Sequence, residues 1–139
     1  MNWIVWAILS AVFAALTAIL AKVGVAGVDS NLATAIRTTV VLVLSWALVF
    51  VLRAGPLQLG ALSRRTWVFL ILSGVATALS WLCYFRALQL GPASKVAPID
   101  KLSVVFVLVI AASFLRETVT RTQWVGGALI VIGAVVLTL

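Results

Sequence analysis

The sequence predicts an all-α, polytopic membrane protein that crosses the bilayer five times. Of its 139 residues, 65% are hydrophobic and 9% are charged, and the mean hydropathy is +1.29. A soluble domain carries about a quarter charged residues. Long apolar runs recur along the chain, with the ~20 residues that a helix needs to cross a hydrocarbon core of about 30 Å. Strands of a membrane barrel have about ten residues with strict alternation, so these runs predict helices.

The predicted helices form a single domain over residues 1–139, and they span residues 3–25, 32–52, 67–90, 96–115 and 123–139. No Lys/Arg-rich head precedes Trp3, so the first helix is expected to be retained and not cleaved as a signal peptide. Asp29, Ser30 or Asn31 is expected to cap the second helix.

Small residues follow one face of the first and last predicted helices. The last helix has Gly126 and Gly133 seven residues apart with Gly127 alongside, and the first has alanines at spacings of four and three: Ala7, Ala11, Ala14, Ala18 and Ala21. Small side chains allow helix backbones to approach closely. These faces are predicted packing surfaces, and the sequence leaves open whether they pack within one chain or between two.

Several functional classes are disfavoured by composition. The chain has no histidine and one cysteine, Cys83, so neither an internal disulfide nor a Cys/His metal cluster is expected. It has no Ser–His, Cys–His or paired-carboxylate constellation and no phosphate-cradling glycine loop, so we expect no enzyme, no ATP-driven pump, no catalytic residue, no metal and no cofactor. Its net charge of +7 is scattered, with no basic run longer than Arg64–Arg65, so nucleic acid is not an expected partner.

Charged residues inside the predicted helices are the candidate functional residues. Arg37, Arg86 and Lys101 each stand about six residues, or ~9 Å, from the nearer end of a helix. A charge at the centre of a span costs roughly 2.5–3.5 kcal/mol on insertion scales, and such charges often mark a site. The long side chains could snorkel to the headgroups, or they could line a water-filled vestibule that attracts an anionic or carboxylate-bearing solute. Asp100 could pair with one of these cations or titrate during transport.

The third predicted helix carries hydroxyls on one face, at spacings of four and three: Ser73, Thr77, Ser80 and Tyr84. These hydroxyls could bond the carbonyls of their own helix, or they could form a polar wall on which Tyr84 and Trp81 present aromatic surface to a solute. Pro98 falls in the first turn of the predicted fourth helix, where a missing N–H is tolerated, or it marks a local break that frees backbone groups for binding.

The basic residues divide evenly between the two sides of the predicted bundle. One side has Arg53, Arg64, Arg65, Arg116 and Arg121, and the other has Lys22, Arg37, Arg86, Lys95 and Lys101. Cationic loops favour the cytoplasm, which weakly favours a cytoplasmic N-terminus. The even division also permits insertion in both orientations.

The stretch from Tyr84 to Leu137 resembles the repeat unit of the drug/metabolite transporter superfamily, EamA type. The matching features are Ala87–Leu88 before the Gly91–Pro92 turn, Pro98 early in the fourth helix, and a Leu-x-Glu that ends at Glu117. Thr120, Gln123 and the glycines of the last helix follow. The earlier helices match mainly in hydropathy and length. Small multidrug exporters of this superfamily use a glutamate in their first helix. The first helix here has no carboxylate, so the resemblance does not extend to carriers of hydrophobic cations.

The resemblance implies a carrier of small metabolites in the cytoplasmic (inner) membrane of a bacterium or archaeon. Most relatives hold two inverted five-helix units, whereas this chain holds one. Two antiparallel copies would rebuild the ten-helix architecture with a site near the midplane. We therefore expect a homodimeric secondary transporter, in contact with membrane lipid, that moves a small polar solute by alternating access. Its expected binding residues are the cations Arg37, Arg86 and Lys101, the counter-ion Asp100, and the wall residues Tyr84, Trp81, Ser80 and Thr77.

Two other functions fit the same sequence. A non-transporting membrane subunit could scaffold a partner through the alanine and glycine faces. A carrier of an anionic lipid headgroup could use the same embedded cations.

Overall fold

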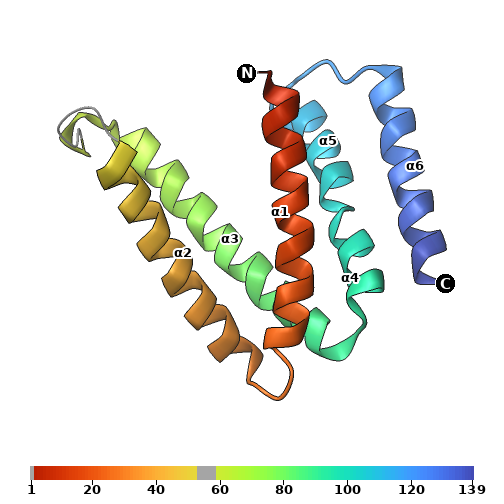
Figure 1. Cartoon of the computed structure of the whole chain (residues 1–139). Coiled ribbons are helices and arrows are strands. Elements are labelled where there is room, and N and C mark those ends of the chain that lie inside the picture. Colours follow the sequence, from red (N-terminus) through yellow and green to blue (C-terminus); the bar gives the residue numbers. More distant parts are fainter. Residues whose placement is uncertain (1, 53–58) are drawn as a thin grey trace. The chain divides into compact units, whose positions relative to one another are not determined.

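A computed structural model describes residues 2–52 and 59–139 (Figure 1). The elements are α1 (Trp3–Gly24), α2 (Ser30–Leu52), a 3₁₀ turn (Leu59–Ala61), α3 (Arg64–Leu90), α4 (Ala93–Asp100), α5 (Ser103–Ser113) and α6 (Arg121–Thr138). Throughout these ranges the regular structure is helical. Arg53, named above among the basic residues on one side of the bundle, lies outside the described residues.

Five helical segments are long and apolar enough to cross a membrane: Trp3–Gly24, Ser30–Leu52, Arg64–Leu90, Ala93–Ser113 and Arg121–Thr138. In the most apolar stretch of each span, at most 11% of the residues are buried within the chain. Large apolar side chains such as Phe13, Leu42 and Phe106 are exposed, as expected for helices whose outer surface meets lipid. The predicted all-α, five-span membrane fold is confirmed.

Contacts between residues divide the chain into two compact units. One contains α1 up to Val23, the last residues of α3 from Ala87, and α4 to α6; the other contains residues 24–86, with α2 and most of α3. The expectation of a single domain stays a prediction, and each unit is described by itself below.

In the first unit, α6 packs on both α4 and α5 (Figure 1). The close approach occurs at Gly127, which is buried; a Cβ there would lie 3.0 Å from Leu108 Cδ1. Ala134, seven residues further along, is also buried. Gly126 and Gly133 are only half-buried, and a Cβ on either would meet nothing within 4 Å. The face of α6 that packs within the unit therefore runs through Gly127 and Ala134.

Only one end of the predicted alanine face of α1 is buried. Ala18 and Ala21 are 7% and 9% exposed, whereas Ala7, Ala11 and Ala14 are exposed. The buried end of the face lies close to Lys22, whose contacts are described below.

Helix ends are fixed by local hydrogen bonds. Thr120 and Gln123 form a capping box at the start of α6: the Thr120 hydroxyl accepts from the Gln123 N–H at 3.3 Å, and Gln123 Oε1 accepts from the Thr120 N–H at 2.7 Å. At the start of α2, Asp29 Oδ1 accepts from the N–H groups of Asn31 and Leu32 at 2.9 and 3.1 Å. Asp29 is thus the residue, among the three candidates, whose side chain caps α2.

The fourth span is divided into α4 and α5. Leu102 N–H donates to Ile99 O at 3.0 Å and Lys101 N–H donates to Pro98 O at 3.1 Å, so the chain tightens at residues 101–102. α4 begins at Ala93, directly after its N-cap Pro92, and Pro98 lies inside it. The prediction that Pro98 falls in the first turn is wrong, because the helix starts three residues earlier than residue 96. An interior proline removes one N–H from the helix, on the side of the preceding turn, and the tightening at residues 101–102 lies beyond it.

After α5, Arg116 adopts a left-handed conformation with φ 53°. The N–H of Glu117 then donates to Ala111 O at 3.0 Å. Glu117 of the Leu-x-Glu pattern therefore takes part, through its backbone, in the turn that closes α5. A residue in the left-handed region commonly ends a helix in this way.

Candidate functional site

Arg37 is the embedded cation with the most defined surroundings. It lies on α2, about 10 Å along the helix axis from Ser30. Its guanidinium carbon Cζ is 4.4 Å from the ring centroid of Trp81 and 5.3 Å from that of Phe85, both on α3. Phe85 is buried and Arg37 half-buried. A cation over two aromatic faces gains a cation–π attraction that strengthens when water is excluded.

Two aromatic rings of α3 lie against this guanidinium, and Tyr84 lies between these two residues in sequence. Tyr84 is half-buried. Trp81, expected as a wall residue, has its ring against the Arg37 guanidinium. Phe85 was missed by the sequence analysis, although its position four residues after Trp81 places both rings on one helix face. The second unit thus brings together Arg37 and Trp81 of the expected site, and it also contains Tyr84.

Arg86 lies in the same unit and is exposed. It lines a cavity of about 530 Å³ between the start of α2 and the end of α3, together with Asp29, Ser30, Asn31, Leu82 and Cys83. The Asp29 carboxylate is already used there as the cap of α2. Cys83 is a free, exposed thiol.

Within the hydroxyl row of α3, Thr77 bonds the backbone of its own helix. Thr77 Oγ1 donates to Ser73 O of its own helix at 2.9 Å, and Thr77 and Ser80 are exposed. The same backbone pattern occurs on α2, where Thr34, Thr38 and Thr39 donate to carbonyls four residues earlier at 2.7, 2.7 and 3.0 Å. For Thr77, the structure has the local hydrogen bond that the sequence left as one of two interpretations.

Lys101 and Asp100 lie in the first unit, at the division between α4 and α5. Lys101 Nζ is 3.4 Å from Asp100 Oδ2, and the two side chains are 58% and 40% exposed. The pairing expected for Asp100 therefore exists with its neighbour in sequence. This distance is longer than the ~2.7–2.9 Å of a strong charge-assisted hydrogen bond, so the ammonium is only weakly engaged.

Two further lysines hold backbone carbonyls at helix ends. Lys22 Nζ donates to Leu88 O at 2.5 Å and Gly91 O at 2.8 Å. Lys95 Nζ donates to Thr138 O at 2.6 Å and Leu139 O at 3.4 Å. The last carbonyls of a helix lack partners within it, and a cation there also interacts favourably with the helix dipole. Sequence analysis missed these contacts, because hydropathy cannot tell which carbonyls a lysine reaches.

Within residues 2–52 and 59–139, no group of three or more His, Cys, Asp or Glu residues is placed to hold a metal ion. What the arrangement offers chemically is electrostatic and apolar contact: a guanidinium over rings, and an exposed ammonium beside one carboxylate.

Comparisons with known proteins extend over the whole chain. A sequence profile of the EamA-like transporter family matches residues 1–139. An uncharacterised transporter in the cobO 3′ region of Sinorhizobium sp. is 51% identical over 137 residues, which cover 98% of this chain and 96% of that protein. An uncharacterised protein of Methanocaldococcus jannaschii is 30% identical over 76 residues, covering 55% of this chain and 56% of that one. No solved structure matches the chain significantly.

Proposed function

The chain belongs to the EamA-like transporter family, and from this premise we propose that it is a secondary transporter. Its solute is a small polar metabolite that is anionic or bears a carboxylate. Transport proceeds by alternating access, in which the binding residues open first to one side of the membrane and then to the other.

The observation that carries this proposal is the position of Arg37. A charge at the centre of a span costs roughly 2.5–3.5 kcal/mol, of which Arg37, about 10 Å from the start of α2, bears a part. A cation–π contact returns about 0.5–2 kcal/mol. The guanidinium is half-buried above Trp81 and Phe85, so one part of it is still open to a further partner. A bound anion would offset the remaining cost, which favours an anionic solute over a neutral or cationic one.

Each unit contributes its own contacts in this proposal. In the second unit, Arg37 and Arg86 attract the solute, and Tyr84, Trp81, Ser80 and Thr77 form the wall. In the first unit, Lys101 attracts it, and Asp100 is the counter-ion that keeps Lys101 compensated when no solute is bound.

The working form is proposed to be an antiparallel homodimer in the cytoplasmic membrane of a bacterium or archaeon. Five spans are few to surround a polar path on all sides. Ala7, Ala11 and Ala14 leave an exposed small-residue face on α1, where a second copy could approach closely. The even division of basic residues permits both orientations, and lipid covers the remaining apolar surface.

Uptake into proteoliposomes tests the function. The full chain is reconstituted and offered radiolabelled carboxylates, each matched to its neutral amide. We expect uptake of at least one carboxylate and not of its amide. Arg37→Gln is expected to lower this uptake more than tenfold, and Arg37→Lys is expected to lower it by a smaller factor. The control is Arg121→Gln, which removes the same charge at the start of α6 and is expected to lower uptake less than twofold.

Three results would contradict the proposal. Equal uptake by Arg37→Gln and the unmodified chain would remove Arg37 from the site. Equal uptake of acids and amides would remove the anionic class. If the chain transports none of the solutes but moves a fluorescent anionic phospholipid between leaflets, it is a lipid carrier; if it does neither, the scaffold function is favoured.

A further inference from the structure

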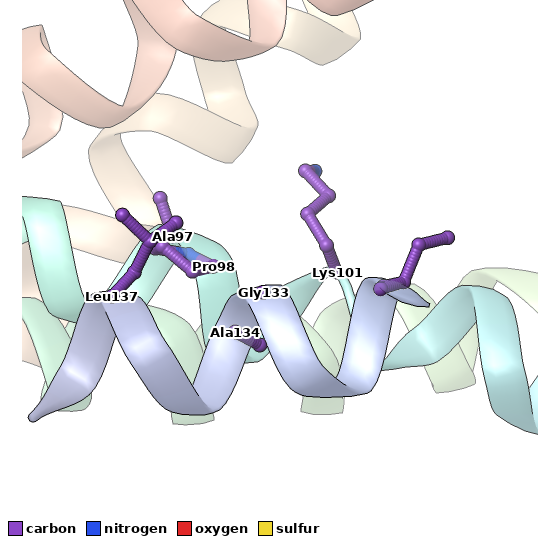
Figure 2. A pocket seen from close by; sticks show the side chains of 7 residues that line it. Ala97, Pro98, Lys101, Gly133, Ala134 and Leu137 are labelled. Carbon is purple, nitrogen blue, oxygen red and sulfur yellow. The ribbon is translucent and has the colours of Figure 1, made fainter. Parts of the chain in front are cut away.

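An open groove of about 390 Å³ lies between α4 and α6 in the first unit (Figure 2). Its apolar lining consists of Ala97, Pro98, Ile130, Gly133, Ala134 and Leu137, and Lys101 is the one charged residue that lines it. Figure 2 shows Ala97, Pro98 and Leu137 gathered at one end and Lys101 toward the other. We infer that this groove binds an amphipathic organic anion, with the apolar body against Gly133 and the anionic group at Lys101.

The groove exists because α6 packs on its neighbours through a face other than the one that carries Gly133. Gly127 and Ala134 are buried in the packing, and this leaves Gly133 half-buried beside them with nothing within 4 Å of where a Cβ would lie. Ala97 on α4 also has a small side chain. Small side chains on both walls, next to a helix interrupted at Pro98 and Lys101, leave space that an ordinary pair of helices would fill.

The chemistry of the lining selects the ligand class. Apart from Lys101, every lining side chain is hydrocarbon, so a sugar-like solute would lose hydrogen bonds to water without gaining others. The Lys101 ammonium has three donors, and its partner Asp100 is 3.4 Å away. A carboxylate could therefore bind Lys101 while an apolar body covers the groove. The volume also lies within the roughly 300–1,000 Å³ of small-molecule sites.

The depth of Lys101 argues against a lipid acyl chain as the occupant. Lys101 lies about 12 Å along the fourth span from Ala93, whereas Leu137 lies next to the end of α6. A lipid with its headgroup at that end would put its hydrocarbon tail beside the ammonium, which would gain no partner beyond Asp100. A ligand whose anionic group reaches Lys101 matches the lining at both ends.

This inference rests on the proposed function and narrows it, because among the anionic or carboxylate-bearing solutes it selects those with an apolar body. Its test is equilibrium binding of radiolabelled 4-phenylbutyrate to the full chain in lipid nanodiscs, with empty nanodiscs as background. The neutral 4-phenylbutyramide has the same body without the charge, and acetate has the charge without the body. We expect the phenylbutyrate to bind at least tenfold more tightly than either.

Variants locate the site. Gly133→Leu is expected to weaken phenylbutyrate binding at least tenfold by filling the groove. Gly126→Leu, an equally open glycine that does not line it, is expected to change binding less than twofold. Lys101→Gln is expected to lower the affinity for phenylbutyrate to that for phenylbutyramide.

Unchanged binding in Gly133→Leu, or equal binding of acid and amide to the unmodified chain, would overturn the inference. If Gly133→Leu reduces cross-linking between two copies but not phenylbutyrate binding, the groove receives a second copy and the inference is wrong.

If polar carboxylates are taken up but phenylbutyrate does not bind, this inference fails and the proposed transporter stands. If phenylbutyrate binds as expected but no solute is taken up, the proposed transport fails instead.

Discussion

At the scale of single residues, four cations near or within the spans have different partners. Arg37 lies over aromatic rings, Lys101 beside an exposed carboxylate, and Lys22 and Lys95 at backbone carbonyls. A lysine that holds carbonyls has its donors directed to the protein, whereas the Lys101 ammonium is largely exposed. These differences separate lysines with a structural role from a lysine that can receive a solute.

The role of Lys22 can be tested by its effect on stability. Lys22→Met removes the donor from Leu88 O and Gly91 O, and hydrogen bonds to a charged group contribute about 1.5–3 kcal/mol. We expect the free energy of unfolding, measured by denaturant titration in mixed micelles, to fall by about that amount. Lys22→Arg should recover most of it. Lys101→Met should lower it by less than about 1 kcal/mol, because exposed ion pairs contribute little. Equal stability of Lys22→Met and the unmodified chain would show that these contacts are not stabilising.

At the scale of elements, run length and hydropathy were sufficient to predict the spans, because a bilayer fixes how long an apolar helix must be. The exact first and last residues of the helices could not be predicted in this way, because hydrogen bonds at the helix ends determine them. α6 begins at Arg121 and not at residue 123, since Thr120 and Gln123 cap it reciprocally. The division after Asp100 was only one of two interpretations of Pro98. It depends on which carbonyls the N–H groups of Lys101 and Leu102 reach, and composition does not determine this.

The neighbouring glycines of α6 provide a matched prediction at this scale. Gly127→Leu would force a side chain against Leu108, whose Cδ1 lies 3.0 Å from the Cβ position, whereas Gly126→Leu enters open space. Overpacking costs roughly 1–3 kcal/mol. We expect Gly127→Leu to unfold at a lower denaturant concentration than the unmodified chain, and Gly126→Leu to unfold at the same concentration or higher. The reverse order would mean that α6 packs through another face.

At the scale of the whole molecule, the sequence could predict a membrane-embedded set of cations but not their partners. Arg37 and Trp81 were each expected in the site, and their contact is known only from the structure. Phe85 was overlooked because an apolar residue in an apolar helix gives no signal until a cation is placed over it. That Lys101 and Gly133 line one groove was equally hidden, since the two residues lie in different spans.

Orientation in the membrane is the remaining prediction at this scale, and it tests the antiparallel dimer. Each predicted side of the bundle carries five basic residues, so we expect both orientations in one population of molecules. C-terminal fusions to green fluorescent protein, which fluoresces only in the cytoplasm, and to alkaline phosphatase, active only outside it, should then both give signal. Replacing Arg64 and Arg65 by Gln leaves three basic residues on the side of the N-terminus against five on the other.

Because the more basic side favours the cytoplasm, this double variant should place the C-terminus inside. Fluorescence should rise and phosphatase activity should fall, at equal amounts of inserted protein. Uptake should fall with them, since an antiparallel pair requires both orientations and the substitutions leave every proposed binding residue in place. If the unmodified chain shows a single orientation, an antiparallel homodimer is impossible, and a parallel assembly or a second protein must complete the path.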